Sequence, residues 1–134
     1  MSSMLSAHFS VEEMQCHDCG VCKVTGELLD ALEQLRALGP EPIDVNDGYR
    51  CPQHNADVGG VNSSQHELGT AADIRIVGLS LQQMYDRAKT VPAFAAGGIG
   101  VYDGGFIHVD TRPGKARWSR KNGVYLGLDV LVTP

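Results

Sequence analysis

The sequence predicts a mixed α+β fold, in which a small antiparallel sheet with flanking helices forms one domain over residues 1–134. A chain of 134 residues with 43% hydrophobic content is near the size of one globular domain and can fill one core. Aromatic residues make up only 6% and there are 16 glycines, which indicates aliphatic packing interrupted by turns. Short segments with strand periodicity are joined by tight turns, which favours antiparallel pairing.

Two capping signals and one amphipathic pattern predict three helices. Ser10 can cap a brief N-terminal helix, because Glu13 lies three residues later and completes a capping box. Leucines recur at three- and four-residue steps between charged residues over residues 25–38, as expected of a core helix that a Gly-Pro pair ends. Ser80 is expected to cap a third helix that runs to about Lys89.

Four segments are predicted to be strands: residues 43–46, 71–77, 97–102 and 106–110. The first is expected to end in a turn at Asp-Gly, and the last two to pair through an Asp-Gly-Gly turn. Residues 51–65 are rich in glycine and small polar residues after an early proline, which predicts a helical turn followed by a surface loop.

The charge and hydropathy of the chain argue against several classes of partner. A formal net charge of -5 and a pI near 5.4 give no general attraction to nucleic acid or to an anionic membrane. No apolar run approaches the roughly 20 residues of a membrane span, so we expect no membrane insertion. The first residues lack a basic region followed by an apolar one, so no export signal is expected in this chain and its localisation stays open. We expect a monomer.

Two histidines and an aspartate form a candidate metal site. His66 and Asp73 flank a short segment that contains Gly69 and Ala71, and such small residues allow the backbone to fold closely enough for both side chains to reach one ion. His108 lies in another predicted strand and supplies a third ligand. Two nitrogens and one carboxylate oxygen are the ligands of a catalytic zinc ion that keeps one position open for water. We therefore expect Zn²⁺ as the cofactor.

Each of these residues also has an ordinary interpretation. A single histidine is commonly a surface residue or a hydrogen-bonded core residue. Asp73 lies in an otherwise apolar strand, where an unpaired carboxylate would be costly, and Arg75 on the same strand face is the ordinary partner for it.

Several motifs follow one another through most of the chain: Phe9-Ser-Val-Glu-Glu-Met, the leucine helix, Asp47-Gly-Tyr-Arg50-Cys-Pro-Gln-His-Asn55, Gly59-Gly60, Ser64-Gln-His66-Glu-Leu-Gly69-Thr-Ala71-Ala-Asp73-Ile74, Gly98-Ile-Gly100-Val-Tyr102 and Phe106-Ile-His108-Val-Asp110. Together they resemble the zinc D-alanyl-D-alanine carboxypeptidases and the related L-alanyl-D-glutamate endopeptidases, of which the Hedgehog zinc domain is a distant relative. The resemblance implies a Hedgehog/DD-peptidase-like zinc fold with His66, Asp73 and His108 as the zinc ligands.

The resemblance also implies an activity and a substrate. It indicates a zinc metallopeptidase that cleaves the stem peptides of bacterial peptidoglycan, as a carboxypeptidase or an endopeptidase, and acts at the cell envelope, in the periplasm or delivered by a phage. In related enzymes an arginine after a Gly-Tyr pair helps to hold a substrate carboxylate or carbonyl oxygen, which assigns that role to Arg50. The ordinary alternative for Arg50 is a salt bridge to Asp47 or Asp44.

The general base is where this sequence departs from its relatives. Several relatives place an acid three residues before the last histidine ligand, and others a histidine two residues before it, but this chain has Gly105 and Phe106 there. Asp110, which shares a strand face with His108, is the nearest acidic candidate, and Asp103 is the second. Asp110 can equally be an acceptor that orients a ligand histidine. The alternative function is a non-catalytic zinc-binding module that recognises cell wall or a protein.

The segment from Thr111 to Trp118 resembles a bacterial branch of the family, in which an arginine and a tryptophan close the sheet after the zinc histidine. Packing is the first interpretation of Trp118. An exposed tryptophan beside Arg112 and Arg117 would instead line a glycopeptide groove.

Four cysteines leave their own chemistry open. Cys16, Cys19 and Cys22 have zinc-knuckle spacing, and Cys51 directly follows the arginine motif. One interpretation is a second, structural zinc held by four sulfurs or by three and His17. The others are one or two disulfides, and reduced, buried thiols.

Overall fold

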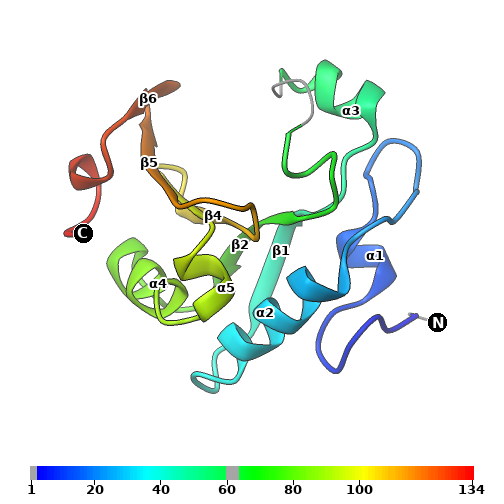
Figure 1. The fold of residues 1–134 in the computed structure, drawn as a ribbon, viewed down its shortest axis with the longest axis horizontal. Coiled ribbons are helices and arrows are strands. Elements are labelled where there is room, and N and C mark those ends of the chain that lie inside the picture. Colours follow the sequence, from blue (N-terminus) through cyan, green and yellow to red (C-terminus); the bar gives the residue numbers. More distant parts are fainter. Residues whose placement is uncertain (1–2, 60–63) are drawn as a thin grey trace.

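The computed structural model describes residues 3–59 and 64–134, which form a mixed α+β fold as predicted (Figure 1). Gly60 and the middle of the predicted surface loop lie outside these residues. Within them, one six-stranded sheet has the order β1-β2-β4-β3-β5-β6. The strands are β1 (Ile43–Asp47), β2 (Ala71–Ile76), β3 (Gly98–Tyr102), β4 (Phe106–Asp110), β5 (Ala116–Lys121) and β6 (Val124–Leu126). The helices are α1 (Val11–Met14), α2 (Gly26–Arg36), α3 (Pro52–Asp57), α4 (Leu81–Ala88), α5 (Pro92–Ala95) and the 3-10 helix η1 (Leu128–Val130).

The sheet is antiparallel except at one pair of strands. β3 and β5 run parallel, whereas β1–β2, β2–β4, β3–β4 and β5–β6 are antiparallel. The exception follows from the chain path. β4 ends at Asp110, which pairs with Gly98 at the start of β3. Residues 111–115 then bring Ala116 to the other edge of β3, where Ala116 also pairs with Gly98. β5 must then run in the same direction as β3.

Side-chain caps set the helix starts largely as the sequence predicts. Ser10 and Glu13 form a reciprocal capping box on α1, and Ser80 forms another on α4. α2 is shorter than the predicted span of residues 25–38, because Thr25 is its N-cap and accepts a hydrogen bond rather than forming the first helical turn. Among the described residues, no helix is long and apolar enough to cross a membrane.

The predicted turn at Asp47-Gly48 is wrong. Asp47 continues β1 and pairs with Asp73 after a bulge, and the chain then runs on past Gly48. The Tyr49 N–H donates to the carbonyl oxygen of Met14, 2.8 Å away, which holds this segment against α1 rather than folding it into a hairpin. The helical turn predicted after it is α3.

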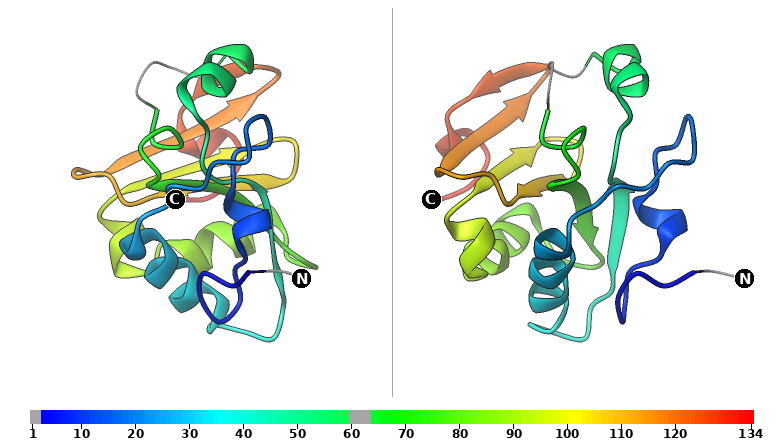
Figure 2. Two further views of the ribbon diagram at one scale, coloured as in Figure 1. Left: turned by 90° about the vertical axis from the view of Figure 1, so that its right-hand side faces the viewer. Right: turned by 45° about the vertical axis from the view of Figure 1, so that its right-hand side comes forward.

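The two faces of the central strands have different roles. One face is apolar and fully buried, and α2, α4 and α5 lie on this side of the sheet (Figures 1 and 2). Every second residue faces the opposite side, where the polar residues lie. The helices therefore stabilise the sheet from one side and leave the other side available for a site. The apolar face consists of Ala72, Ile74, Ile76, Ile99, Val101, Ile107 and Val109.

Glu33 of α2 holds the N-terminal segment to this helix, and its replacement gives a first testable prediction. The Ser6 hydroxyl and the His8 backbone N–H each donate to Glu33 Oε2 over 2.7 Å, and His8 Nδ1 lies 2.6 Å from Oε1. Burial raises the pKa of Glu33, but the hydrogen bonds from Ser6 and His8 outweigh it and leave the pKa below its ordinary value.

A lowered carboxyl pKa stabilises the fold above the unfolded pKa of about 4.3, and this stabilisation is lost as the pH falls through the folded pKa. Glu33→Gln is therefore expected to lower the free energy of unfolding by about 1 kcal/mol at neutral pH and by much less near pH 3, as measured by urea denaturation. Asp30→Asn, at an exposed position of the same helix, is the control. A deficit for Glu33→Gln that is equal at both pH values would contradict the prediction.

Candidate metal centre

The register of the sheet places four site residues in one row. Asp73 of β2 is opposite His108 of β4, His108 is opposite Gly100 of β3, and Gly100 is opposite Trp118 of β5. All four lie on the face opposite the helices. Asp73 and His108 are therefore neighbours because of strand pairing, although they are far apart in the sequence.

His66 reaches the row from the turn that leads into β2. This turn closes with hydrogen bonds from the Leu68 N–H to the Ser64 carbonyl and from the Gly69 N–H to the His66 carbonyl. Gly69 has a φ of +77°, and a Cβ at this position would collide with the carbonyl oxygen of Lys23. A glycine is therefore required for the turn that brings His66 over Asp73.

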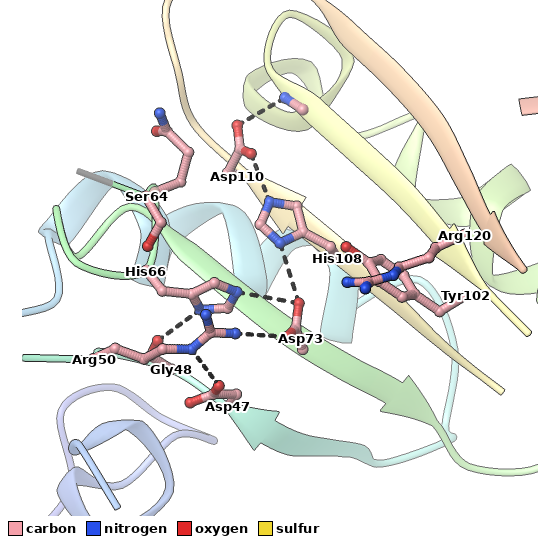
Figure 3. Close-up of polar contacts among 12 residues, drawn as sticks. Asp47, Gly48, Arg50, Ser64, His66, Asp73, Tyr102, His108, Asp110 and Arg120 are labelled. Carbon is pink, nitrogen blue, oxygen red and sulfur yellow. Dashed lines mark hydrogen bonds and ion pairs between the residues drawn. The ribbon is translucent and has the colours of Figure 1, made fainter. Parts of the chain in front are cut away.

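The three candidate ligands converge on one point, as Figure 3 shows. His66 Nε2 lies 3.2 Å from Asp73 Oδ1, and His108 Nδ1 lies 3.1 Å from the same oxygen. Their donor atoms all lie within 4.8 Å of one another, and all three side chains are buried. Arg75, the ordinary partner considered for Asp73, instead donates to the carbonyl oxygens of Gly104 and Gly105.

Hydrogen bonds on the outer side of each imidazole determine which nitrogen faces the centre. His66 Nδ1 lies 2.8 Å from the Gly48 carbonyl oxygen, and His108 Nε2 lies 2.6 Å from Asp110 Oδ2. Both partners are acceptors, so these two nitrogens carry the protons. In the neutral rings the inner nitrogens then direct lone pairs at the Asp73 carboxylate. Two imidazole nitrogens and a carboxylate that face one another in a buried place form a donor set that fits zinc.

The charged neighbours of Asp73 and His108 shift the pKa values of these two side chains in opposite directions. Burial raises the pKa of Asp73, but the two histidines outweigh it and hold the pKa well below its usual range. Burial lowers the pKa of His108, but the carboxylates of Asp110 and Asp73 more than compensate and raise it. Asp73 is therefore a carboxylate, the form that binds a metal ion.

Asp110 lies behind His108 rather than in the cleft. Its side chain is 0% exposed and accepts hydrogen bonds from His108 Nε2, from the Gly98 N–H at 2.8 Å and from Arg112 Nη2 at 2.6 Å. Burial raises the pKa of Asp110, but His108 and Arg112 outweigh it and hold the pKa well below its usual range. With both oxygens engaged, Asp110 has the geometry of a group that orients His108.

The three candidate ligands lie in a cleft of about 460 Å³. Arg50 and Asp103 also line it, whereas Asp110 is not among the described residues that do so. The Asp103 carboxylate is exposed and accepts a hydrogen bond from the Asn122 N–H over 2.9 Å. A volume of this size can hold a short peptide segment next to the candidate metal ligands.

Arg50 forms one of the salt bridges considered for it and also lines the cleft. Its Nε donates to Asp47 Oδ2 over 2.6 Å, so one of the predicted ordinary partners is present. Its Nη1 donates to Asn55 Oδ1 over 3.3 Å, and Nη2 lies 3.6 Å from Asp73 Oδ2 (Figure 3). The salt bridge thus holds a half-buried guanidinium at the wall of the cleft.

Trp118 and Arg112 line the cleft, but Arg117 binds backbone elsewhere. The Trp118 indole Nε1 donates to the Tyr102 hydroxyl oxygen over 3.3 Å, and the Arg112 guanidinium carbon lies 5.2 Å from the centroid of the Trp118 rings. Arg117 instead donates to the carbonyl oxygens of Ala95 and Gly97. Trp118 therefore both packs within the site and forms part of its wall.

Sequence reasoning named three residues of β3 only as part of a motif and missed how they shape the site. A Cβ at Gly98 would overlap the Asp110 carboxylate, and a Cβ at Gly100 would overlap the Trp118 indole. Tyr102, the third, lines the cleft, and its burial raises the pKa of its hydroxyl to about 12. The available signal was the Gly-x-Gly-x-Tyr spacing, because alternate residues of a strand share one face.

Two imidazoles and one carboxylate at the base of an open cleft are the donor set of a catalytic metal site. The family model of peptidase M15 matches residues 7–110, and the chain belongs to this family. The peptidoglycan L,D-endopeptidase MepK of Escherichia coli K12 is 31% identical over 96 residues, which cover 66% of this chain and 51% of that protein. The zinc D-Ala-D-Ala carboxypeptidase of Streptomyces albus G is 47% identical over 44 residues, or 32% of this chain and 17% of that protein. This chain thus spans about half the length of the MepK relative.

Proposed function

We propose that this chain is a zinc-dependent peptidase that cleaves peptide bonds in the stem peptides of bacterial peptidoglycan. The observation that carries the proposal is the convergence of His66, Asp73 and His108 at the base of a cleft of about 460 Å³. Membership of the M15 family supports it, as do the names of the two relatives, which specify peptidoglycan and zinc. We further propose a Hedgehog/DD-peptidase-like fold and action at the cell envelope.

We also propose that residues 1–134 form one domain and act as a monomer. Most of the described helices and strands contribute to one hydrophobic cluster, and β5 and β6 continue the same sheet, as expected for a single domain. All three candidate metal ligands come from this one chain, which supports the monomer.

In this proposal His66, Asp73 and His108 hold the zinc ion. When bound, zinc supplies a Lewis acid that polarises a carbonyl oxygen and activates water. Gly48 and Asp110 are positioning groups, because each accepts a hydrogen bond from the outer nitrogen of one histidine and so keeps the inner nitrogen free to bind metal.

Arg50 and Tyr102 are the proposed contacts to the substrate. Arg50 is already oriented by Asp47 and lines the cleft, so its guanidinium can bind a substrate carboxylate with little loss of side-chain entropy. With a pKa of about 12, the Tyr102 hydroxyl keeps its proton at neutral pH and can donate a hydrogen bond to an oxygen that gains negative charge.

Asp103 is the proposed proton acceptor. Asp73 and Asp103 are the two carboxylates among the described residues that line the cleft, and Asp73 is engaged by the histidines. Asp103 is exposed at the turn between β3 and β4, from which it can take a proton from the attacking water and pass it to the leaving amine. Asp110 is buried behind His108, which supports a positioning role for it instead.

The test is incubation of zinc-loaded protein with purified peptidoglycan, followed by mass spectrometry of the released fragments. Asp103→Asn is expected to keep its zinc and to lose turnover by roughly a hundred-fold or more. Asp110→Asn is expected to bind zinc about 10- to 100-fold more weakly. Asp44→Asn, at an exposed position of β1, should change neither property.

The alternative, a non-catalytic zinc module that recognises cell wall, predicts a different pattern. The unmodified protein would sediment with peptidoglycan and release no fragment, although zinc occupancy is complete. That result would overturn the proposed activity. Turnover that survives in Asp103→Asn would instead overturn only the assignment of the proton acceptor.

A further inference from the structure

Three cysteines form a second cluster outside the cleft. Within residues 3–59 and 64–134, the sulfur atoms of Cys16, Cys19 and Cys51 all lie within 4.8 Å of one another. The Sγ atoms of Cys16 and Cys51 are 3.6 Å apart, although 35 positions separate them in the sequence. Cys16 and Cys19 belong to the loop between α1 and α2, and Cys51 is the N-cap of α3 beside that loop (Figure 1).

The backbone of the loop is folded around the Cys16 sulfur. The Cys16 N–H donates to the Val21 carbonyl over 2.7 Å, the Gly20 N–H donates back to the Cys16 carbonyl over 2.9 Å, and Gly20 has a φ of +73°. The backbone N–H groups of Cys19 and Asp18, within this turn, and of Cys51, at the start of α3, are directed at the Cys16 sulfur. Donors around a sulfur stabilise its thiolate form, which is the form that binds metals.

We propose that Cys16, Cys19 and Cys51 bind a second, structural zinc ion as thiolates, with an imidazole of His17 or His54 as the fourth ligand. Three thiolates and one histidine form a closed tetrahedral shell, which is typical of structural zinc. Two imidazoles are available nearby in the chain: His17 lies between Cys16 and Cys19 in the sequence, His54 lies one helical turn after Cys51, and their ring centroids are 6.3 Å apart.

Two observations favour a metal ion over a disulfide. A disulfide joins two sulfurs, and here a third converges on the same place, where it would remain as a thiol in contact with the bond. Cys22, which also has zinc-knuckle spacing, packs against the hydrophobic core instead. Of the three cysteines in the loop, only Cys16 and Cys19 therefore join the cluster. Zinc binding would release the remaining thiol protons to solvent, with no oxidant required.

This second ion would fix the segment that carries Arg50. Arg50 directly precedes Cys51, and its N–H donates to the carbonyl oxygen of His66 over 3.2 Å. Anchoring Cys51 to the loop of Cys16 and Cys19 would limit the motion of Arg50 at the cleft wall. The cluster would thus be a brace for the cleft and take no part in its chemistry.

Zinc stoichiometry measured by native mass spectrometry tests the proposal, with cobalt substitution as a second readout. The unmodified protein is expected to bind two zinc ions, and Cys51→Ser and Cys16→Ser one. The matched control Cys22→Ser should retain two. Replacement of both His66 and Asp73 by alanine should empty the cleft and leave one ion. In that double variant Co²⁺ should still show the near-ultraviolet charge-transfer absorption of thiolate ligation, and this absorption should be absent when Cys51→Ser is added.

Other outcomes would overturn the proposal. One zinc ion in the unmodified protein, unchanged in Cys51→Ser, would exclude the second site, and an intact mass lower by two hydrogen atoms would identify a disulfide in its place. Loss of the second ion in Cys22→Ser would show that the ligand set is wrong. Retention of the second ion in both His17→Asn and His54→Asn, each at undiminished affinity, would overturn the imidazole ligand. None of these results depends on whether the cleft hydrolyses peptides.

Discussion

Replacing Asp73 with asparagine is expected to empty the cleft of zinc and to lower the rate of peptide hydrolysis about a thousand-fold, equivalent to roughly 4 kcal/mol of transition-state stabilisation. Asp73 Oδ1 is the atom to which both ligand histidines point, at 3.2 Å and 3.1 Å. An amide has no negative charge with which to balance a cation held by two neutral imidazoles. Its side chain is also buried, so water replaces the lost ligand poorly.

The measurement is zinc affinity by competition with a chelator, together with release of fragments from peptidoglycan. Asp44→Asn on the neighbouring strand β1 is the control, because it removes one carboxylate from an exposed position of the same sheet. Unchanged zinc affinity in Asp73→Asn would show that the ion is bound elsewhere. Unchanged turnover after confirmed loss of zinc would show that the metal is not needed for the reaction.

Gly98→Ala is expected to destabilise the protein by about 3 kcal/mol and to weaken zinc binding about 10- to 100-fold, although residue 98 contacts no ion. The added Cβ would overlap the Asp110 carboxylate, which cannot move freely because His108, Arg112 and the residue 98 N–H all bind it. Displacing Asp110 removes the acceptor from His108 Nε2, so the ring loses the contact that fixes its orientation.

Thermal unfolding and zinc affinity measure the two effects. Gly26→Ala is the matched control, because a Cβ there has no atom within 4 Å and lies in the first turn of α2, where alanine is a better helix former. The control should be as stable as the unmodified protein or slightly more so. If both variants behave alike, the close fit between β3 and Asp110 does not contribute to the site.

The sequence predicts well those features that depend on short stretches of chain. The caps at Ser10 and Ser80 and the hairpin of β3 and β4 are set by neighbouring residues, and the structure confirms them. Alternation along residues 71–77 indicates that Asp73 faces away from the apolar side, as observed. The grouping of His66, Asp73 and His108 is predicted from spacing, ligand chemistry and the family resemblance, whereas the pairing of β2 with β4 that brings Asp73 opposite His108 is seen only in the structure.

What the sequence could not give depends on contacts between distant segments. The parallel pairing of β5 with β3 follows from where β4 ends, which no local pattern records. Asp110 shares a strand face with His108, and that placement suggested a proton acceptor. Only the side-chain geometry shows that it binds the outer nitrogen and lies outside the cleft lining. The role of Gly98 likewise requires knowledge of what lies across the strand.

The division of the central strands into an apolar face and a metal-binding face restricts how this protein can change during evolution. Inserting or deleting a single residue within β2 would turn Asp73 toward the helices, and the same change within β4 would turn His108. Either change would bring apolar side chains such as isoleucine and valine into the cleft. Such length changes would destroy the core and the metal centre together. New specificity can therefore arise mainly in the connections that border the cleft, including the turn at Asp103 and the end of β5 near Gly123.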